Sequence, residues 1–260
     1  VTGWIEWIAG RYKEWQGTEN AFPDEFDNEH SRDIEPMKGG FGDNYYCQLV
    51  ANVRRYKGVR SAPPTSAPTT IEIDGRFDSW DQVQPEFRHH KGSTMHRDHR
   101  GYGKTHYQDS SGRNDFVAAK AARDANNLYF YVETAEPITA PTGPGWMTLL
   151  IDVDRDKSTG WEGYDYAVNR LEPAGSEAIM ERSRQGWNWS AVGKVAFRVE
   201  GSRMELGIPR TLLGLPSNGP LNFEFKWTDN VPPSGDILDF YLHGDVAPSG
   251  RFNYRYSEEI

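Results

Sequence analysis

Three carboxylates at alternate positions, Asp152, Asp154 and Asp156, suggest a cation-binding turn. They follow the mainly apolar run 147–151, so they leave what reads as a buried strand. Alternate carboxylates at a strand end place several oxygens on one side of a turn, which suits Ca²⁺, and Asp165 is the further ligand we expect. The alternative is a solvated turn whose carboxylates accept hydrogen bonds from nearby backbone amides. A catalytic carboxylate pair is disfavoured, because no local apolar pocket would raise one pKa.

Aromatic residues form the second set of candidates, since the chain contains nine tryptophans and thirteen tyrosines. The C–H faces of a pyranose pack on an exposed ring, while polar side chains bond to its hydroxyls. Trp146 is the first candidate, because it stands in a loop directly before the acidic strand. The other candidates are Trp161, Tyr164, Trp187 and Trp189. For each ring, the alternative is packing in the core or at an edge.

A histidine-rich stretch, His89–His106, holds five of the seven histidines. Imidazoles can assemble a transition-metal site, and a long loop of this kind can instead line a binding face. Met95 and His96 are adjacent, and a methionine and a histidine together ligate haem in some proteins. No haem is expected here, because no pocket for the macrocycle is legible in the sequence.

The charge and composition of the 260-residue chain exclude several classes of partner. The formal net charge is -9, which disfavours nucleic acid and anionic membranes. No apolar run approaches the roughly 20 residues that cross a bilayer, so membrane insertion is not expected. Cys47 is the only cysteine, which rules out an intrachain disulfide and a Cys-rich zinc site.

The elements that must position these side chains divide into three segments. Residues 1–60 contain a short strand and a helix, "DNYYCQLVANVRRYKG", with Asp43 or Asn44 as N-cap and Gly58 as C-cap. Residues 61–70, "SAPPTSAPTT", read as a semi-extended linker. Residues 71–260 alternate apolar and polar side chains in "NLYFYVET", "KVAFRVE" and "NFEFKWTD". This pattern predicts a mainly β protein whose body is an antiparallel β-sandwich.

The sandwich region resembles a family 9 carbohydrate-binding module, within the wider group that includes DOMON domains. The similar stretches are "IEIDGRFDSWDQV", "AARDANNLYFYVETAEPI" and "GPGW" followed by the strand ending in "ID". The resemblance covers about residues 70–256 and implies polysaccharide or chain-end binding, with Trp146 as the loop tryptophan. Asp245 stands where the family has its second tryptophan, so the usual two-ring clamp is in doubt.

The first 60 residues are similar to the end of family 99-like (WbsX-type) glycan-processing (β/α)8 barrels. The stretches that carry this are "TGWIEW", "EHSRDIEPMKGGFGDNYY" and "QLVANVRRYKG". The resemblance implies a strand whose carboxyl end carries Glu6, a weak candidate for catalysis. A glycosidase needs two carboxylates, so we expect no complete active site in this chain.

Together, these observations predict a non-catalytic carbohydrate-binding module of a larger, secreted or periplasmic, bacterial glycoside-hydrolase-type protein. No signal peptide is visible, and we expect an upstream barrel to precede this fragment. Two alternatives stay open: an enzyme fragment whose incomplete site includes Glu6, and a structural or metal-binding sandwich without sugar affinity.

Overall fold

The computed structural model describes residues 12–15, 17–21, 34, 36–94, 96–101, 103–141 and 143–258. Its contacts divide the chain into two compact units, which are described separately. The first comprises Val1–Ser61 with His96–Ser110, and the second comprises Ala62–Met95 with Ser111–Ile260. The histidine-rich stretch is therefore divided between the two units.

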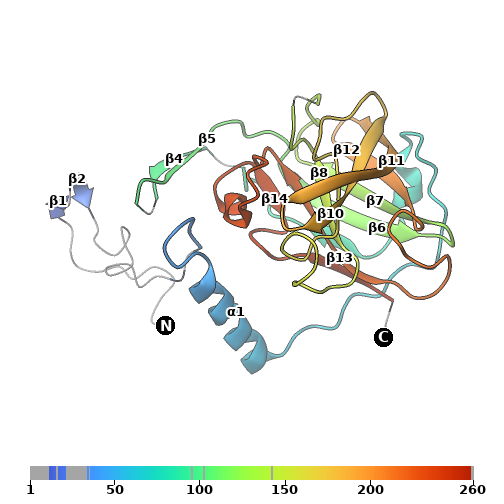
Figure 1. Ribbon diagram of the computed structural model, residues 1–260, viewed down its shortest axis with the longest axis horizontal. Helices are drawn as coiled ribbons and strands as arrows, with labels where there is room; N and C mark the ends of the chain where they lie inside the picture. The colour runs from blue at the N-terminus through green and yellow to red at the C-terminus, as the bar shows by residue number, and fades with distance from the viewer. Residues whose placement is uncertain are drawn as a thin grey trace. The chain divides into compact units, whose positions relative to one another are not determined.

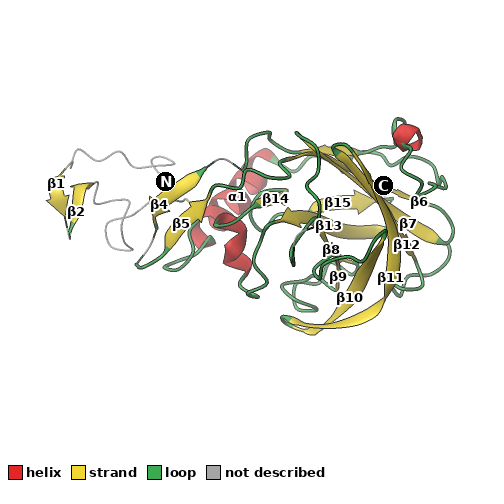
Figure 2. Cartoon of the chain, turned by 90° about the horizontal axis from the view of Figure 1, so that it is seen from above, coloured by secondary structure: helices red, strands yellow, loops and turns green. Residues whose placement is uncertain are grey.

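The second unit is mainly β, as the alternating pattern predicts (Figures 1 and 2). One antiparallel sheet runs in the order β14-β13-β8-β9-β10-β11-β12-β7-β6-β3, and β15 also pairs with β13. The sheet curls until it is nearly closed, so its inner face encloses the core. The strands are β3 (Glu86–Arg88), β6 (Phe116–Arg123), β7 (Asn127–Thr134), β8 (Thr148–Asp152), β9 (Tyr166–Val168), β10 (Glu177–Gln185), β11 (Asn188–Glu200), β12 (Arg203–Pro209), β13 (Asn222–Asp229), β14 (Asp245–Ala247) and β15 (Tyr254–Ser257).

Side-chain alternation along the strands builds the interior core. In β8, Leu149 and Ile151 point inward and lie opposite Trp227 and Phe225 of β13. These four side chains are fully buried, together with the other inward-facing apolar residues of the sheet. The residues between them in β8 point to the outer face, because successive side chains of a strand lie on opposite sides.

Two smaller apolar clusters cover parts of the outer face. One surrounds Trp80 at the end of the 3-10 helix η2 (Phe77–Trp80) and packs on Tyr129 and Tyr131 of β7. The Trp80 indole donates to Glu205 Oε2 at 2.8 Å, which ties the "IDGRFDSW" turn to β12. The other cluster includes residues of β8, β9 and β14, and contains the candidate site.

The segment expected to be a linker is partly attached to the sandwich. Ser66 N donates to the Gln84 carbonyl, and Thr69 N donates to the Arg123 carbonyl. The Thr70 hydroxyl also donates to Asp124 at 3.0 Å. Composition predicts an extended conformation here, but it does not reveal that a sheet edge offers these partners.

The first unit contains β1 (Tyr12–Trp15), β2 (Thr18–Ala21), α1 (Asn44–Lys57), β4 (Arg97–Arg100) and β5 (His106–Asp109). The predicted helix is confirmed in α1, which begins after Asp43 and ends at Gly58. Gly58 has a φ of 81° and donates its N–H to the Arg54 carbonyl. Glu6 lies outside the described residues. Among the described helices, none is long and apolar enough to span a membrane.

Candidate functional site

Three tryptophans from two parts of the chain gather on the outer face. Trp161 lies in the loop between β8 and β9, Trp187 in the β10–β11 turn, and Trp189 on β11. The ring centroids of Trp161 and Trp187 are 4.3 Å apart, and those of Trp187 and Trp189 are 5.7 Å apart. In both pairs the rings meet edge to face, the geometry that aromatic quadrupoles favour.

The loop before the 3-10 helix η3 (Ile237–Tyr241) is held by these indoles. Trp161 Nε1 donates to the Gly235 carbonyl, and Trp187 Nε1 donates to the Pro233 carbonyl, both at 3.1 Å. Gly235 has a φ of 78°, and a Cβ there would lie 2.7 Å from Trp187 Cγ. Both the conformation and the close approach therefore require glycine at this position.

These groups surround an open pocket, called the aromatic pocket below. Its floor is the outer face of β8 and β13, and its walls come from the loops and η3. The lining residues are Gly145, Thr148, Leu150, Trp161, Arg170, Trp187, Thr228, Val231, Pro232, Pro233, Asp236 and Phe240. The lining is mainly apolar with a few polar groups, which is typical of small-molecule sites.

Arg170 is the main charged group of the aromatic pocket. Its Nε and Nη2 donate to the buried Glu181 carboxylate at 2.8 and 2.5 Å. The guanidinium carbon also lies 5.7 Å from the centroid of Trp187 and 6.0 Å from that of Trp189. A bidentate ion pair and two cation–π contacts hold the guanidinium in one orientation. Sequence reasoning missed Arg170, because nothing in "YAVNR" distinguishes it from the other arginines.

Trp146 does not present an exposed ring, contrary to the expectation from its loop position. Only 1% of the residue is exposed, its ring centroid is 5.8 Å from that of Phe197, and its Nε1 donates to the Thr139 carbonyl at 2.8 Å. Tyr164 is also buried, and its hydroxyl donates to Asn253 Oδ1 at 2.7 Å. Both rings therefore support the structure around the site and offer no free face to a ligand.

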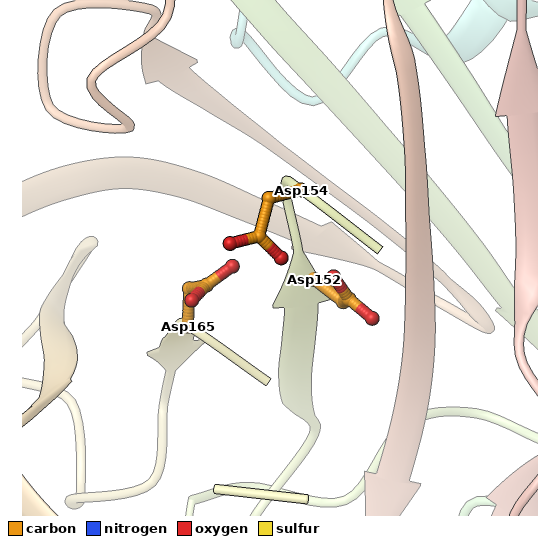
Figure 3. A group of neighbouring side chains, drawn as sticks. All are labelled: Asp152, Asp154 and Asp165. Carbon is orange, nitrogen blue, oxygen red and sulfur yellow. The ribbon is translucent and has the colours of Figure 1, made fainter. Parts of the chain in front are cut away.

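The acidic turn lies on the same outer face, at the end of β8. Carboxylate oxygens of Asp152, Asp154 and Asp165 all lie within 4.8 Å of one another (Figure 3). Asp156 is not in this group, and its Oδ1 accepts from the backbone N–H and the hydroxyl of Ser158. The structure thus brings together three of the four predicted ligands, in an arrangement that oxygen-preferring cations use.

Hydrogen bonds within the turn already compensate part of its negative charge. Asp152 is fully buried, and Lys157 Nζ lies 2.7 Å from its Oδ2 and 2.9 Å from Glu224 Oε2. Asp165 Oδ2 accepts from Val153 N at 3.0 Å. Burial and the neighbouring carboxylates Asp154 and Asp152 raise the pKa of Asp165 to about 6. Features of a cation site and of a hydrogen-bonded turn are both present.

The histidine-rich stretch does not assemble a shared metal site among the described side chains. His89 belongs to the second unit, where its Nε2 lies 3.6 Å from Asp245 Oδ1. His106 belongs to the first unit and lies 2.6 Å from Asp98 Oδ1. The acidic turn contains the one group of three metal-binding side chains found among the described residues.

The comparisons with known proteins found no match: no protein-family model, no curated protein and no solved structure is similar enough to this chain. The fold and the site thus define a mainly β domain with an aromatic pocket and an acidic turn on one face.

Proposed function

We propose that the β-sandwich is a non-catalytic carbohydrate-binding module and that the aromatic pocket is its ligand site. The observation that supports this proposal is the gathering of Trp161, Trp187 and Trp189 beside the fixed guanidinium of Arg170. Sugar recognition requires an aromatic surface together with oriented polar groups. Trp187 meets the first requirement, because it is partly exposed and lines the open pocket.

The polar groups of the site can serve the hydroxyls of a sugar. Arg170 donates hydrogen bonds, and the exposed carboxylate of Asp236 accepts them. A polysaccharide chain or chain end would place a ring against Trp187 and its hydroxyls towards these two residues. The acidic turn would bind Ca²⁺ in a structural role, holding the β8–β9 loop that carries Trp161.

A module of this kind assists a catalytic domain by keeping it close to its substrate. The gain arises from effective concentration, without any chemistry in the module itself. The proposal places this chain in a larger glycoside-hydrolase-type protein, secreted or periplasmic, with a barrel upstream. In the alternative proposal, an enzyme fragment, Glu6 would contribute to a site that other residues complete.

The test is a titration of the chain with plant, algal and microbial polysaccharides and oligosaccharides, read by tryptophan fluorescence. We expect saturable binding that Trp187→Ala weakens at least tenfold, since tenfold corresponds to about 1.4 kcal/mol and truncation of a central aromatic contact commonly costs about 2 kcal/mol or more. Tyr56→Ala is the matched control, because this exposed aromatic lies on α1 in the other unit.

Two outcomes would refute the proposal. One is an absence of binding across the panel by a chain that circular dichroism shows to be folded. The other is binding that Trp187→Ala leaves unchanged, which would place the ligand elsewhere on the surface.

A further inference from the structure

The size of the aromatic pocket limits which part of a sugar can enter it. The cavity volume is about 30 Å³. One water needs roughly 10–15 Å³ on this measure, so the cavity accepts a group of about two or three heavy atoms. A pyranose ring is much larger and must lie across the opening. Only a substituent of the ring can therefore fill the interior.

The walls of the cavity favour an apolar substituent. Leu150 and Phe240 are buried side chains of the outer cluster, and Trp161 is only 5% exposed. A hydroxyl placed against them would give up hydrogen bonds to water, whereas a methyl group gains from leaving water. A methyl-terminated substituent thus fits the walls better than a hydroxyl group does.

The polar part of the lining suits a carbonyl oxygen. The ion pair with Glu181 uses Nε and Nη2 of Arg170, and Nη1 forms no hydrogen bond to the described part of the chain. Thr228 contributes a hydroxyl on the floor, where it pairs directly with Thr148 across the two strands. The Thr148 hydroxyl already donates to the Asn169 carbonyl at 3.2 Å, so it offers no proton to a ligand. These donors stand beside apolar walls. An acetyl group complements both, because its C=O accepts hydrogen bonds and its CH₃ packs against apolar side chains.

We propose that the aromatic pocket recognises a small methyl-terminated substituent of the polysaccharide, in the first place an acetyl group. The sugar ring lies against Trp187, the methyl group contacts Leu150 and Phe240, and the carbonyl accepts from Arg170. This inference rests on the proposed function, because it assigns the class of glycan that the same site binds. O-acetyl and N-acetyl groups share this chemistry.

The experiment compares matched ligands by isothermal titration calorimetry. One arm uses acetylated xylan and the same polymer after mild alkaline deacetylation; the other uses chitin and chitosan oligosaccharides of equal length. We expect the acetylated form to bind at least tenfold more tightly, in line with discrimination of single small groups by apolar pockets. The arm that shows the difference distinguishes O-acetyl from N-acetyl recognition.

Two variants at one position link the preference to the cavity. Val231 lines the pocket from a loop, so Val231→Phe should narrow the cavity and abolish the tenfold preference. Val231→Ala leaves the cavity open and should retain the preference, and thermal melting confirms that each variant is folded.

The possible failures are distinguishable. Equal affinity for acetylated and deacetylated ligands overturns this inference and leaves sugar binding intact. A preference that Val231→Phe retains also overturns it. Absence of binding to every polysaccharide, in both arms and in the wider panel, overturns the proposed function as well.

Discussion

The two faces of β8 and β13 differ in chemistry, although the same strands build both. On the inner face, Leu149 and Ile151 contact other apolar side chains in a closed core. On the outer face, Leu150 shares a smaller cluster with indoles, and Asp152 and Lys226 are buried nearby. The inner face therefore provides stability. The outer face retains buried ionisable groups and an open cavity.

The buried ionisable side chains of the outer face reduce the stability of the fold. Lys226 is fully buried, and its Nζ donates to the Pro248 carbonyl and lies 5.4 Å from the centroid of Phe240. Burial lowers the pKa of Lys226 well below its ordinary value. A side chain of this kind stabilises the fold less than an apolar residue of the same shape would. An apolar replacement of Lys226 should therefore raise stability, whereas truncation of an inner-face side chain should lower it.

The largest expected change in stability comes from a substitution in the inner core. Trp146→Ala should lower the free energy of unfolding by about 3–5 kcal/mol, because it removes a buried indole and leaves a cavity. Urea denaturation measures this loss. By comparison, Trp187→Ala should lower stability much less and affect mainly ligand binding. Near-normal stability of Trp146→Ala would contradict the burial of this ring.

The second effect concerns the acidic turn. If it binds calcium, saturation at 100 times the dissociation constant should stabilise the fold by about 2.7 kcal/mol. Thermal unfolding in calcium and in a chelator measures this shift. Asp154→Asn should remove it while the fold persists, because Asp154 is exposed. An identical melting temperature in both buffers would favour the turn stabilised by its own hydrogen bonds and by Lys157.

The third effect is a gain in stability. The depressed pKa of Lys226 means that the unfolded chain binds more protons between the native pKa and the ordinary value of 10.5. Stability should therefore rise with pH across this window and level off above it. Asp245 opposes the lowering of this pKa, and Lys157 adds to it.

Lys226→Met should remove most of this pH dependence. It should also raise the unfolding free energy at pH 7 by on the order of 1 kcal/mol. Chemical denaturation from pH 7 to 10 tests both statements. A variant that is less stable than the parent chain at pH 7 would show that the amine contributes more than its desolvation costs.

The smallest effect is expected at Asp156. Its hydrogen bonds to Ser158 are exposed, so Asp156→Ala should leave the unfolding free energy almost unchanged. The calcium-dependent shift, where present, should be unchanged in this variant. A loss of that shift would show that Asp156 is a calcium ligand, as the alternate spacing predicts.

Local sequence was sufficient to predict strands β7, β8, β11 and β13, the helix and the position of the acidic turn. The alternation in "NFEFKWTD" places Phe225 and Trp227 on one face, because side-chain direction in a strand is a property of neighbouring residues. Helix α1 likewise ends before Gly58, whose positive φ is a conformation that glycine adopts readily. Asp152 and Asp154 are close in space because they are close in sequence.

Tertiary structure alone decided which side chains meet on the outer face. Trp146 is buried and Trp187 is partly exposed because different loops cover them, and the length of a loop does not reveal what it covers. Asp165 joins the acidic group across the β8–β9 pairing, and Arg170 is oriented by Glu181 on a neighbouring strand. These contacts depend on the register between strands, which brings together residues that no local pattern connects.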